Sequence, residues 1–431
     1  MSGQGLSRDR GPDGAGPHTG LARVFGNEVG GVGTIGASMM ALMLGPSAIL
    51  LLSFGTFMRA LHAEFGWSIP AISIGASIIA LTIVLVSPVQ GWLIDRLGAR
   101  AVVLGSAPVW GLGLILMAFL PARIDVFYLA CFLLTVAASG LLPPSFMQVV
   151  TTWFDRHMGL AMGAINLAPG LAATALPFLL TFAFERVGWR GGYAILGAAV
   201  LLLLWPTAAI WLRQGPKGRT DEAGHPPVGL PYAEAARTRV FWLTGYIFLV
   251  LGMISTGLVV NQIAILMDAG VPGDRAVSIQ AAIGLGSVFA RLATGWLLDR
   301  VSVRAVGMLT CGIAAAACLV LVSPAAPRYA IGASVAVGLV IGAEFDVLGV
   351  LVRRYHGFVA FGRIFGTTFS AFQLGGAIGA AGLGISRVQT GSYTPALVAF
   401  AGLILIGAAL FPLFGDYRFT VEDSTRSKNN L

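Results

Sequence analysis

Most of the sequence consists of apolar runs about 20 residues long that contain almost no charged residue. A helix needs that length to cross about 30 Å of hydrocarbon. Helices are required there because the bilayer offers no partner for an unpaired backbone amide. Only 11% of the residues are charged, against roughly 25% in a soluble domain. The sequence therefore predicts an all-α membrane protein with about twelve transmembrane helices.

A polar stretch near the middle of the chain separates six apolar runs from six more. We therefore expect a disordered cytoplasmic tail, an N-terminal six-helix bundle, a cytoplasmic central loop, a C-terminal six-helix bundle and a cytoplasmic C-tail, at residues 1–33, 34–213, 214–239, 240–415 and 416–431. Of the 27 Lys and Arg residues, 19 fall in the tails and loops of one side and 7 in those of the other. This bias predicts that both termini are cytoplasmic. The expected absence of a long extracellular domain, together with the overall character of the sequence, favours a plasma membrane, specifically a bacterial inner membrane.

The net charge of +8 does not indicate nucleic-acid binding, because the basic residues lie in short loops where they orient a membrane protein. Cys131, Cys311 and Cys318 lie within apolar runs and are expected to be small buried residues. The sequence has no group of residues with metal-ligand spacing and no phosphate-binding glycine loop. We therefore expect no metal, no cofactor and no enzymatic activity.

A ten-residue segment recurs at the same place in each half of the chain. Gly91-Trp-Leu-Ile-Asp-Arg-Leu-Gly-Ala-Arg100 ends the second span, and Gly295-Trp-Leu-Leu-Asp-Arg-Val-Ser-Val-Arg304 ends the eighth. Six positions are identical at an offset of 204 residues. This duplication predicts two pseudo-symmetric bundles.

The pattern Gly-x-x-x-Asp-Arg-x-Gly-x-Arg between spans two and three resembles the signature of the major facilitator superfamily. The resemblance covers residues 34–415. It implies two bundles, usually of a monomer, that rock around a central site opening alternately to each side. It also implies a role in conformational gating for residues of the signature and its copy, Gly91, Asp95, Arg96, Arg100, Asp299, Arg300 and Arg304.

A narrower resemblance is to the monocarboxylate and oxalate/formate branch of that superfamily. Phe65-Gly-Trp-Ser68 is similar to the phrase before span two in bacterial members, and Trp153-Phe-Asp-Arg-His-Met-Gly-Leu-Ala-Met-Gly163 is similar to the pattern that opens span five. The acidic and aromatic motif of span one in animal monocarboxylate carriers is absent. The resemblance therefore places the chain in the branch without matching it to one carrier.

Arg291 is the most informative charged residue, because it lies inside span eight. An Arg near a helix centre costs roughly 2.5–3.5 kcal/mol on insertion scales, and its planar fork matches a carboxylate. Arg291-Leu-Ala-Thr-Gly295 resembles the branch's phrase Arg-x-x-x-Gly, whose arginine is implied to hold the substrate carboxylate. The alternative is a structural ion pair with an acid of span ten. Ser287 stands where animal carriers have an aspartate, and 367–387 lacks the lysine of the oxalate exchangers.

Four further polar residues in the spans are candidates. Glu344 and Asp346 in span ten could carry a coupled proton, or could form a cytoplasmic latch with the signature arginines. Asn261 and Gln262 in span seven could contact substrate, or could only hydrogen-bond between helices, an ambiguity that Asn166 shares.

Taken together, these residues predict a secondary transporter of a small organic anion, a monocarboxylate in particular, that moves its substrate with a proton. Its partners would be the lipid bilayer, the anion and protons, with no nucleic acid. One alternative is an efflux carrier or facilitator of amphipathic organics in which Arg291 is structural. A more distant one is a membrane sensor that transports nothing.

Overall fold

The computed structural model describes residues 30–154, 157–215 and 228–419. Most of the predicted disordered N-terminal tail, the centre of the polar loop and the end of the C-tail lie outside the described residues, as do Asp155 and Arg156.

The described residues are almost entirely helical. In chain order the elements are α2 (Val32–Met43), η2 (Ser47–Leu52), α3 (Phe54–Phe65), α4 (Ile69–Leu97), α5 (Ala99–Met117), α6 (Ile124–Ala137), η3 (Ala138–Leu141), α7 (Pro143–Trp153), α8 (Met158–Ala199), η4 (Val200–Leu204), α9 (Trp205–Trp211), α10 (Tyr232–Ala235), α11 (Arg239–Asp268), α12 (Gly273–Leu298), α13 (Val303–Val322), α14 (Ala326–His356), α15 (Phe361–Thr390), α16 (Thr394–Leu410) and η6 (Phe411–Phe414).

Eleven helical stretches in the described residues are long and apolar enough to cross a membrane. One of them, Met158–Trp211, has 54 residues, about twice the length that a single crossing needs. Its helix breaks at Gly188, whose φ of 70° and ψ of 175° are not helical. A residue without a Cβ adopts a positive φ at little cost. Counting this stretch as two spans accounts for the twelve that the sequence predicts.

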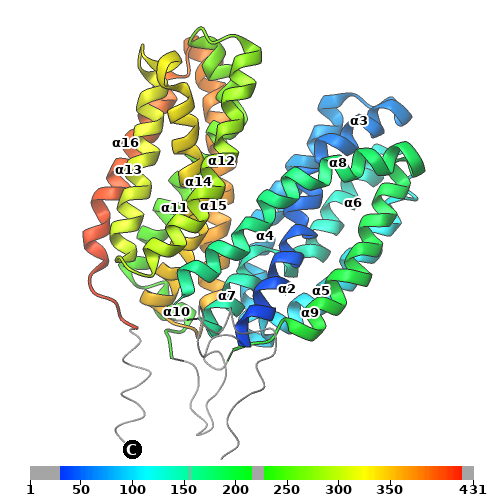
Figure 1. Ribbon diagram of the computed structural model, residues 1–431, viewed down its shortest axis with the longest axis horizontal. Helices are drawn as coiled ribbons and strands as arrows, with labels where there is room; N and C mark the ends of the chain where they lie inside the picture. The colour runs from blue at the N-terminus through cyan, green and yellow to red at the C-terminus, as the bar shows by residue number, and fades with distance from the viewer. Residues whose placement is uncertain (1–29, 155–156, 216–227, 420–431) are drawn as a thin grey trace, which may run out of the picture.

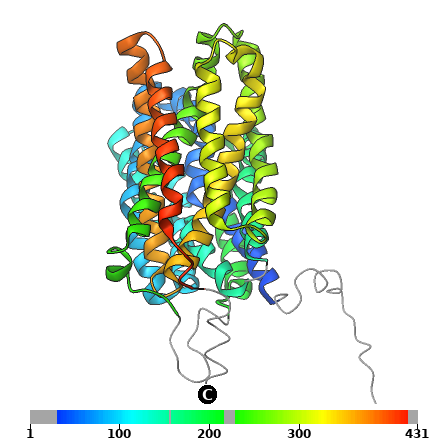
Figure 2. The ribbon, with the colours of Figure 1, turned by 90° about the vertical axis from the view of Figure 1, so that its left-hand side faces the viewer.

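The helices form two bundles that meet at one end and splay apart at the other (Figure 1). Elements α2 to α9 make the N-terminal bundle, and α11 to α16 make the C-terminal bundle, which lies in front of it in Figure 2. The bundles touch where α4 packs on α15 and α8 packs on α12. The start of α2, the short helix α10 and the end of α16 lie at this end. We call it the closed end and define it by Asp95, Gly159, Asp299 and Gly362.

Large apolar side chains also cover much of the outer surface. Leu116, Phe178, Leu285 and Val388 are each more than two-thirds exposed, on helices of both bundles. A soluble monomer rarely exposes so much contiguous apolar surface, whereas hydrocarbon accommodates it. The predicted all-α membrane fold is thus confirmed.

Candidate functional site at the contact between the bundles

Asp95 holds the N-terminus of a helix in the opposite bundle. Its two carboxylate oxygens accept hydrogen bonds from the backbone N–H groups of Gly362 and Arg363, each at 2.8 Å. These donors belong to the first turn of α15, whose own N-cap, Ala360, provides no side-chain acceptor. A helix leaves its first N–H groups without partners and carries partial positive charge there. The Asp95 carboxylate satisfies both demands and thereby ties α4 to α15.

Asp299 makes the equivalent contact in the second half of the repeat. Its carboxylate accepts from the N–H groups of Gly159 at 2.7 Å and Leu160 at 3.2 Å, in the first turn of α8. The N-cap of α8, His157, likewise contributes no capping hydrogen bond from its side chain. Each bundle therefore caps one helix of the other with a signature aspartate.

Pairs of glycines allow the helices to approach this closely. A Cβ on Gly91 would lie 2.2 Å from the carbonyl oxygen of Gly362, and one on Gly295 would lie 2.4 Å from that of Gly159. Ordinary van der Waals contact begins at 3.4 Å. The closed end can therefore close only if the first residue of each signature copy, Gly91 or Gly295, has no Cβ.

The signature arginines remain within their own bundles. Arg100 donates to the carbonyl of Ala209 at 2.7 Å, and Arg304 to that of Gly415 at 2.8 Å, both near the end of the last span of a bundle. Arg96 lies over the ring of Trp92, and Arg300 lies over that of Trp296. These contacts shape each half of the closed end but do not bridge it.

Arg291 lies at the same contact, one helical turn from Gly295. A Cβ on Gly163 of α8 would come within 2.3 Å of the Arg291 carbonyl oxygen, so the two backbones touch here. Arg291 is only 8% exposed, and among the described residues its side chain forms no hydrogen bond and no ion pair within 4.0 Å. Its nitrogens are not among the fully enclosed polar atoms that lack a partner. They therefore keep some surface that water can reach.

Two buried carboxylates act electrostatically on Arg291 without touching it. Glu344 accepts from the Ser255 hydroxyl on α11 at 3.0 Å, within the C-terminal bundle. Asp346 accepts from the Asn166 amide on α8 at 2.5 Å, across the contact between the bundles. Among the described residues neither acid contacts Arg300. The predicted latch with the signature arginines is therefore not formed, and Asp346 pairs with Asn166 instead.

Asn261 and Gln262 lie away from this contact. The Asn261 amide donates to the carbonyls of Gly257 and Ala380, and the buried Gln262 amide donates to the Ser334 hydroxyl. All these partners belong to the C-terminal bundle. Helix packing requires contacts of this kind, and contact of either amide with substrate stays a prediction.

Three residues at the closed end are not singled out by the sequence argument. Gly362 and Arg363 receive Asp95, and the buried Arg353 donates to the Phe154 carbonyl at 2.9 Å, from α14 to the N-terminal bundle. A signal for the first exists, because Gly159-x-x-x-Gly163 recurs as Gly362-x-x-x-Gly366, 203 residues later. The sequence shows no comparable signal for Arg353.

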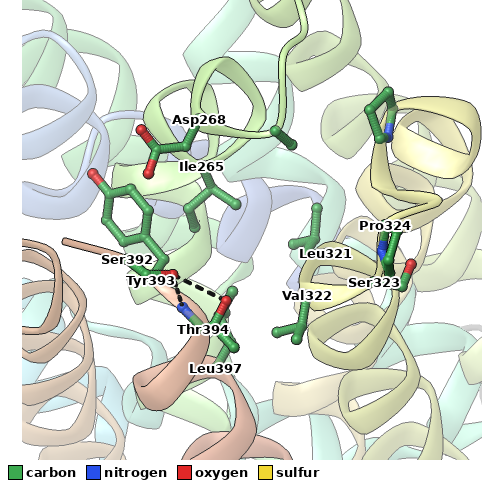
Figure 3. A pocket seen from close by; sticks show the side chains of 12 residues that line it. Ile265, Asp268, Leu321, Val322, Ser323, Pro324, Ser392, Tyr393, Thr394 and Leu397 are labelled. Carbon is green, nitrogen blue, oxygen red and sulfur yellow. Dashed lines mark hydrogen bonds between the residues drawn. The ribbon is translucent and has the colours of Figure 1, made fainter. Parts of the chain in front are cut away.

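A separate cavity of about 190 Å³ lies within the C-terminal bundle near the splayed end. Its lining combines apolar side chains such as Leu321 and Leu397 with Asp268 and the hydroxyl groups of Ser392 and Thr394 (Figure 3). The Asp268 carboxylate already pairs with Arg387 at 2.9 Å. Because the cavity lies near the splayed end, it is remote from the contact between the bundles and from Arg291.

Comparisons with known proteins agree with this architecture. The family model of the Major Facilitator Superfamily matches residues 31–380. Monocarboxylate transporter 11 of Mus musculus is 29% identical over 402 residues, which cover 89% of this chain and 87% of the relative. Monocarboxylate transporter 13 of Rattus norvegicus is 26% identical over 390 residues, covering 89% of each.

Solved structures share the fold at low sequence identity. The E. coli fucose:proton symporter superposes with a TM-score of 0.66 at 13% identity, covering 89% of this chain and 98% of the symporter. A bacterial homologue of the iron transporter ferroportin, in its outward-facing state, gives 0.67 at 14% identity, covering 88% and 99%. The expectation of a multi-pass membrane transporter and not an enzyme is confirmed by the family match. The chain belongs to the Major Facilitator Superfamily.

Proposed function

We propose that this protein carries a small organic monocarboxylate across a plasma membrane by alternating access. The observation that carries the proposal is Arg291, a buried guanidinium without a hydrogen bond or ion pair among the described residues, at the contact between the bundles. Keeping such a group in a membrane interior is costly unless an anion reaches it. A guanidinium binds a carboxylate through two parallel hydrogen bonds. The names of the relatives above, monocarboxylate transporters, support the same substrate class.

The arrangement of the bundles supports an outward-facing state. The closed end holds the start of α2, helix α10 and the end of α16, and the excess of basic residues in the loops and tails of this side supports assigning these segments to the cytoplasm. The splayed end then faces outward. The ferroportin homologue of similar fold also has an outward-facing state. We propose that the caps by Asp95 and Asp299 hold this state and break when the protein opens inward.

We propose that transport is coupled to protons, because buried acids lie in the electrostatic field of Arg291. Moving an anion alone across a membrane works against the membrane potential, at about 2.3 kcal/mol per charge per 100 mV. A proton carried with the anion removes that cost.

An efflux carrier of amphipathic organics remains the second candidate. The fujikurins efflux protein of Gibberella fujikuroi is 24% identical over 333 residues, covering 75% of this chain and 69% of the relative. In that case Arg291 would only balance Asp346 and Glu344. The two candidates differ in whether a carboxylate substrate needs Arg291.

The test is uptake into proteoliposomes containing the purified protein. Labelled lactate, pyruvate, acetate, formate, oxalate and a neutral sugar are compared with and without an inward proton gradient. We expect saturable uptake of at least one monocarboxylate, lost in Arg291→Gln. Arg275→Gln is the matched control, because Arg275 lies on the same helix near its outer end. No uptake of any acid, or normal uptake by Arg291→Gln in a protein that elutes as a folded monomer, would overturn the proposal.

A further inference from the structure

The hydrogen bond between Asn166 and Asp346 joins the two bundles. Both side chains are buried, and the amide nitrogen lies 2.5 Å from Oδ1 of the carboxyl group. The other oxygen, Oδ2, is fully enclosed and has no hydrogen-bond partner among the described residues. Because α8 and α14 belong to different bundles, the bond persists only while the closed end is closed.

The charge balance around Asp346 is simple. In the described part of the chain, the charged side chain that acts on it is Arg291 from α12. Within the described residues, helix α8 places the uncharged Gly163 and Asn166 beside it, and no charged group of α11, α13 or α15 acts on it. Arg291 therefore lies in the field of two carboxylates, Asp346 and Glu344, and a substrate carboxylate can take the place of Asp346 once Asp346 is neutral.

Glu344, equally buried, is connected differently. Its carboxylate accepts from Ser255 on α11, and both helices belong to the C-terminal bundle. Motion of one bundle against the other leaves that bond intact. A proton on Glu344 would change the charge near Arg291 but would not change any contact between the bundles.

We propose that Asp346 is the residue that carries the coupled proton, and that Asn166 transmits its protonation state to the contact between the bundles. The inference rests on the proposed function, in which Arg291 holds the monocarboxylate. A hydronium ion gives its proton to Oδ2, which forms an O–H bond and leaves a water molecule and a neutral acid. The substrate carboxylate then replaces Asp346 as the counterion of Arg291, so one proton and one anion bind together. On the other side the proton returns to water, the Asp346 carboxylate re-forms, and the anion leaves.

The inference is tested with the acid of the uptake panel that the wild-type protein carries fastest. Concentrative uptake under an inward proton gradient is compared with counterflow at equal pH on both sides, which needs no net proton movement. For one proton per anion, a gradient of one pH unit supports about tenfold accumulation. We expect Asp346→Asn to reduce the accumulation ratio to one while counterflow persists. Glu344→Gln removes the other acid near Arg291, so its uptake rate can change, but we expect its accumulation ratio under the gradient to stay above one.

Asn166→Ala provides an independent measurement. The Asn166 N–H stabilises the ionised carboxylate, so its removal favours the protonated form. We expect the midpoint of the uptake–pH profile to move to higher pH by about one unit. Thr174→Ala is the control on the same helix, since its hydroxyl bonds only to the Gly170 carbonyl in its own turn.

Three outcomes would decide against the inference, and they differ from failure of the proposed function. Gradient-driven accumulation by Asp346→Asn would show that the proton binds elsewhere. If Asp346→Asn also loses counterflow, the decision rests on Asn166→Ala, whose unchanged pH profile would overturn the inference. Loss of accumulation in Glu344→Gln with counterflow intact would assign the proton to Glu344. Absence of any monocarboxylate transport by the wild-type protein would refute the proposed function itself.

Discussion

The contact between Gly91 and Gly362 offers a direct test of how the closed end works. In Gly91→Ala the new Cβ would lie 2.2 Å from the Gly362 carbonyl oxygen and 2.7 Å from the Arg363 Cα. Contact at 3.4 Å or more requires α4 and α15 to move apart by roughly 1.2 Å. The obstacle is backbone, so no side-chain rotation relieves it. The same movement would lengthen both hydrogen bonds from the α15 N-terminus to Asp95.

The size of the effect follows from the cost of overpacking, typically about 1–3 kcal/mol. This cost falls on the closed form alone, because the helices are apart when the closed end opens. The equilibrium between the two forms should therefore shift toward opening by roughly 5- to 150-fold. Gly295→Ala, whose Cβ would lie 2.4 Å from the Gly159 carbonyl oxygen, should have a similar effect at the symmetric contact.

The shift can be measured as a distance between spin labels at Leu97→Cys and Val301→Cys. These exposed positions, 62% and 40% accessible, follow equivalent signature aspartates in the two bundles. The three native cysteines are buried and should label poorly. We expect Gly91→Ala to add a longer distance to the distribution. Gly105→Ala and Gly284→Ala, where nothing lies within 4 Å of the new Cβ, should leave it unchanged. A distribution for Gly91→Ala identical to wild type would refute the argument.

Two more predictions follow from the site. Asp95→Asn and Asp299→Asn each remove the charge of a carboxylate that caps a helix of the other bundle. Each should therefore favour opening of the closed end by about 1–3 kcal/mol. The same pair of spin labels measures this opening, and an unchanged distance would show that the caps do not hold the closed form. Gln262→Leu should leave KM for the monocarboxylate unchanged, because the Gln262 amide bonds to Ser334 inside the C-terminal bundle; a several-fold increase in KM would instead place Gln262 in the substrate path.

The sequence predicts the individual residues of the site better than their partners. The duplicated segment identifies both signature aspartates, and an arginine in an apolar span identifies Arg291, since each departs from the local composition. The backbone groups that Asp95 receives are 267 and 268 residues away, and Asn166 is 180 residues from Asp346. Such partners depend on how the two bundles dock. The repeated Gly-x-x-x-Gly pattern points to Gly362, but no local pattern points to Asn166. The sequence does not predict the role of Arg353 for the same reason, because its partner is a backbone carbonyl of the other bundle.

The contacts of α4 with α15 and of α8 with α12 have the same backbone arrangement but different side chains. A Cβ on Gly163 would meet the carbonyl oxygen of Arg291, and at the other contact a Cβ on Gly366 would meet the carbonyl oxygen of Ser87. Ser87 is the equivalent of Arg291 in the first half of the chain, 204 residues before it. The Ser87 hydroxyl donates only to the Ile83 carbonyl of its own helix.

Arg291, the nearby acid Asp346 and Asn166, whose amide donates to Asp346, thus all lie at the contact of α8 with α12 and α14. Glycines and capping aspartates, which govern the approach of the helices, are duplicated at both contacts. A symmetric frame allows the bundles to rock about one centre, while an anion with a single carboxylate needs only one cation. Under the proposed function, the symmetric part of the closed end serves the motion, and the asymmetric part at Arg291 serves the substrate.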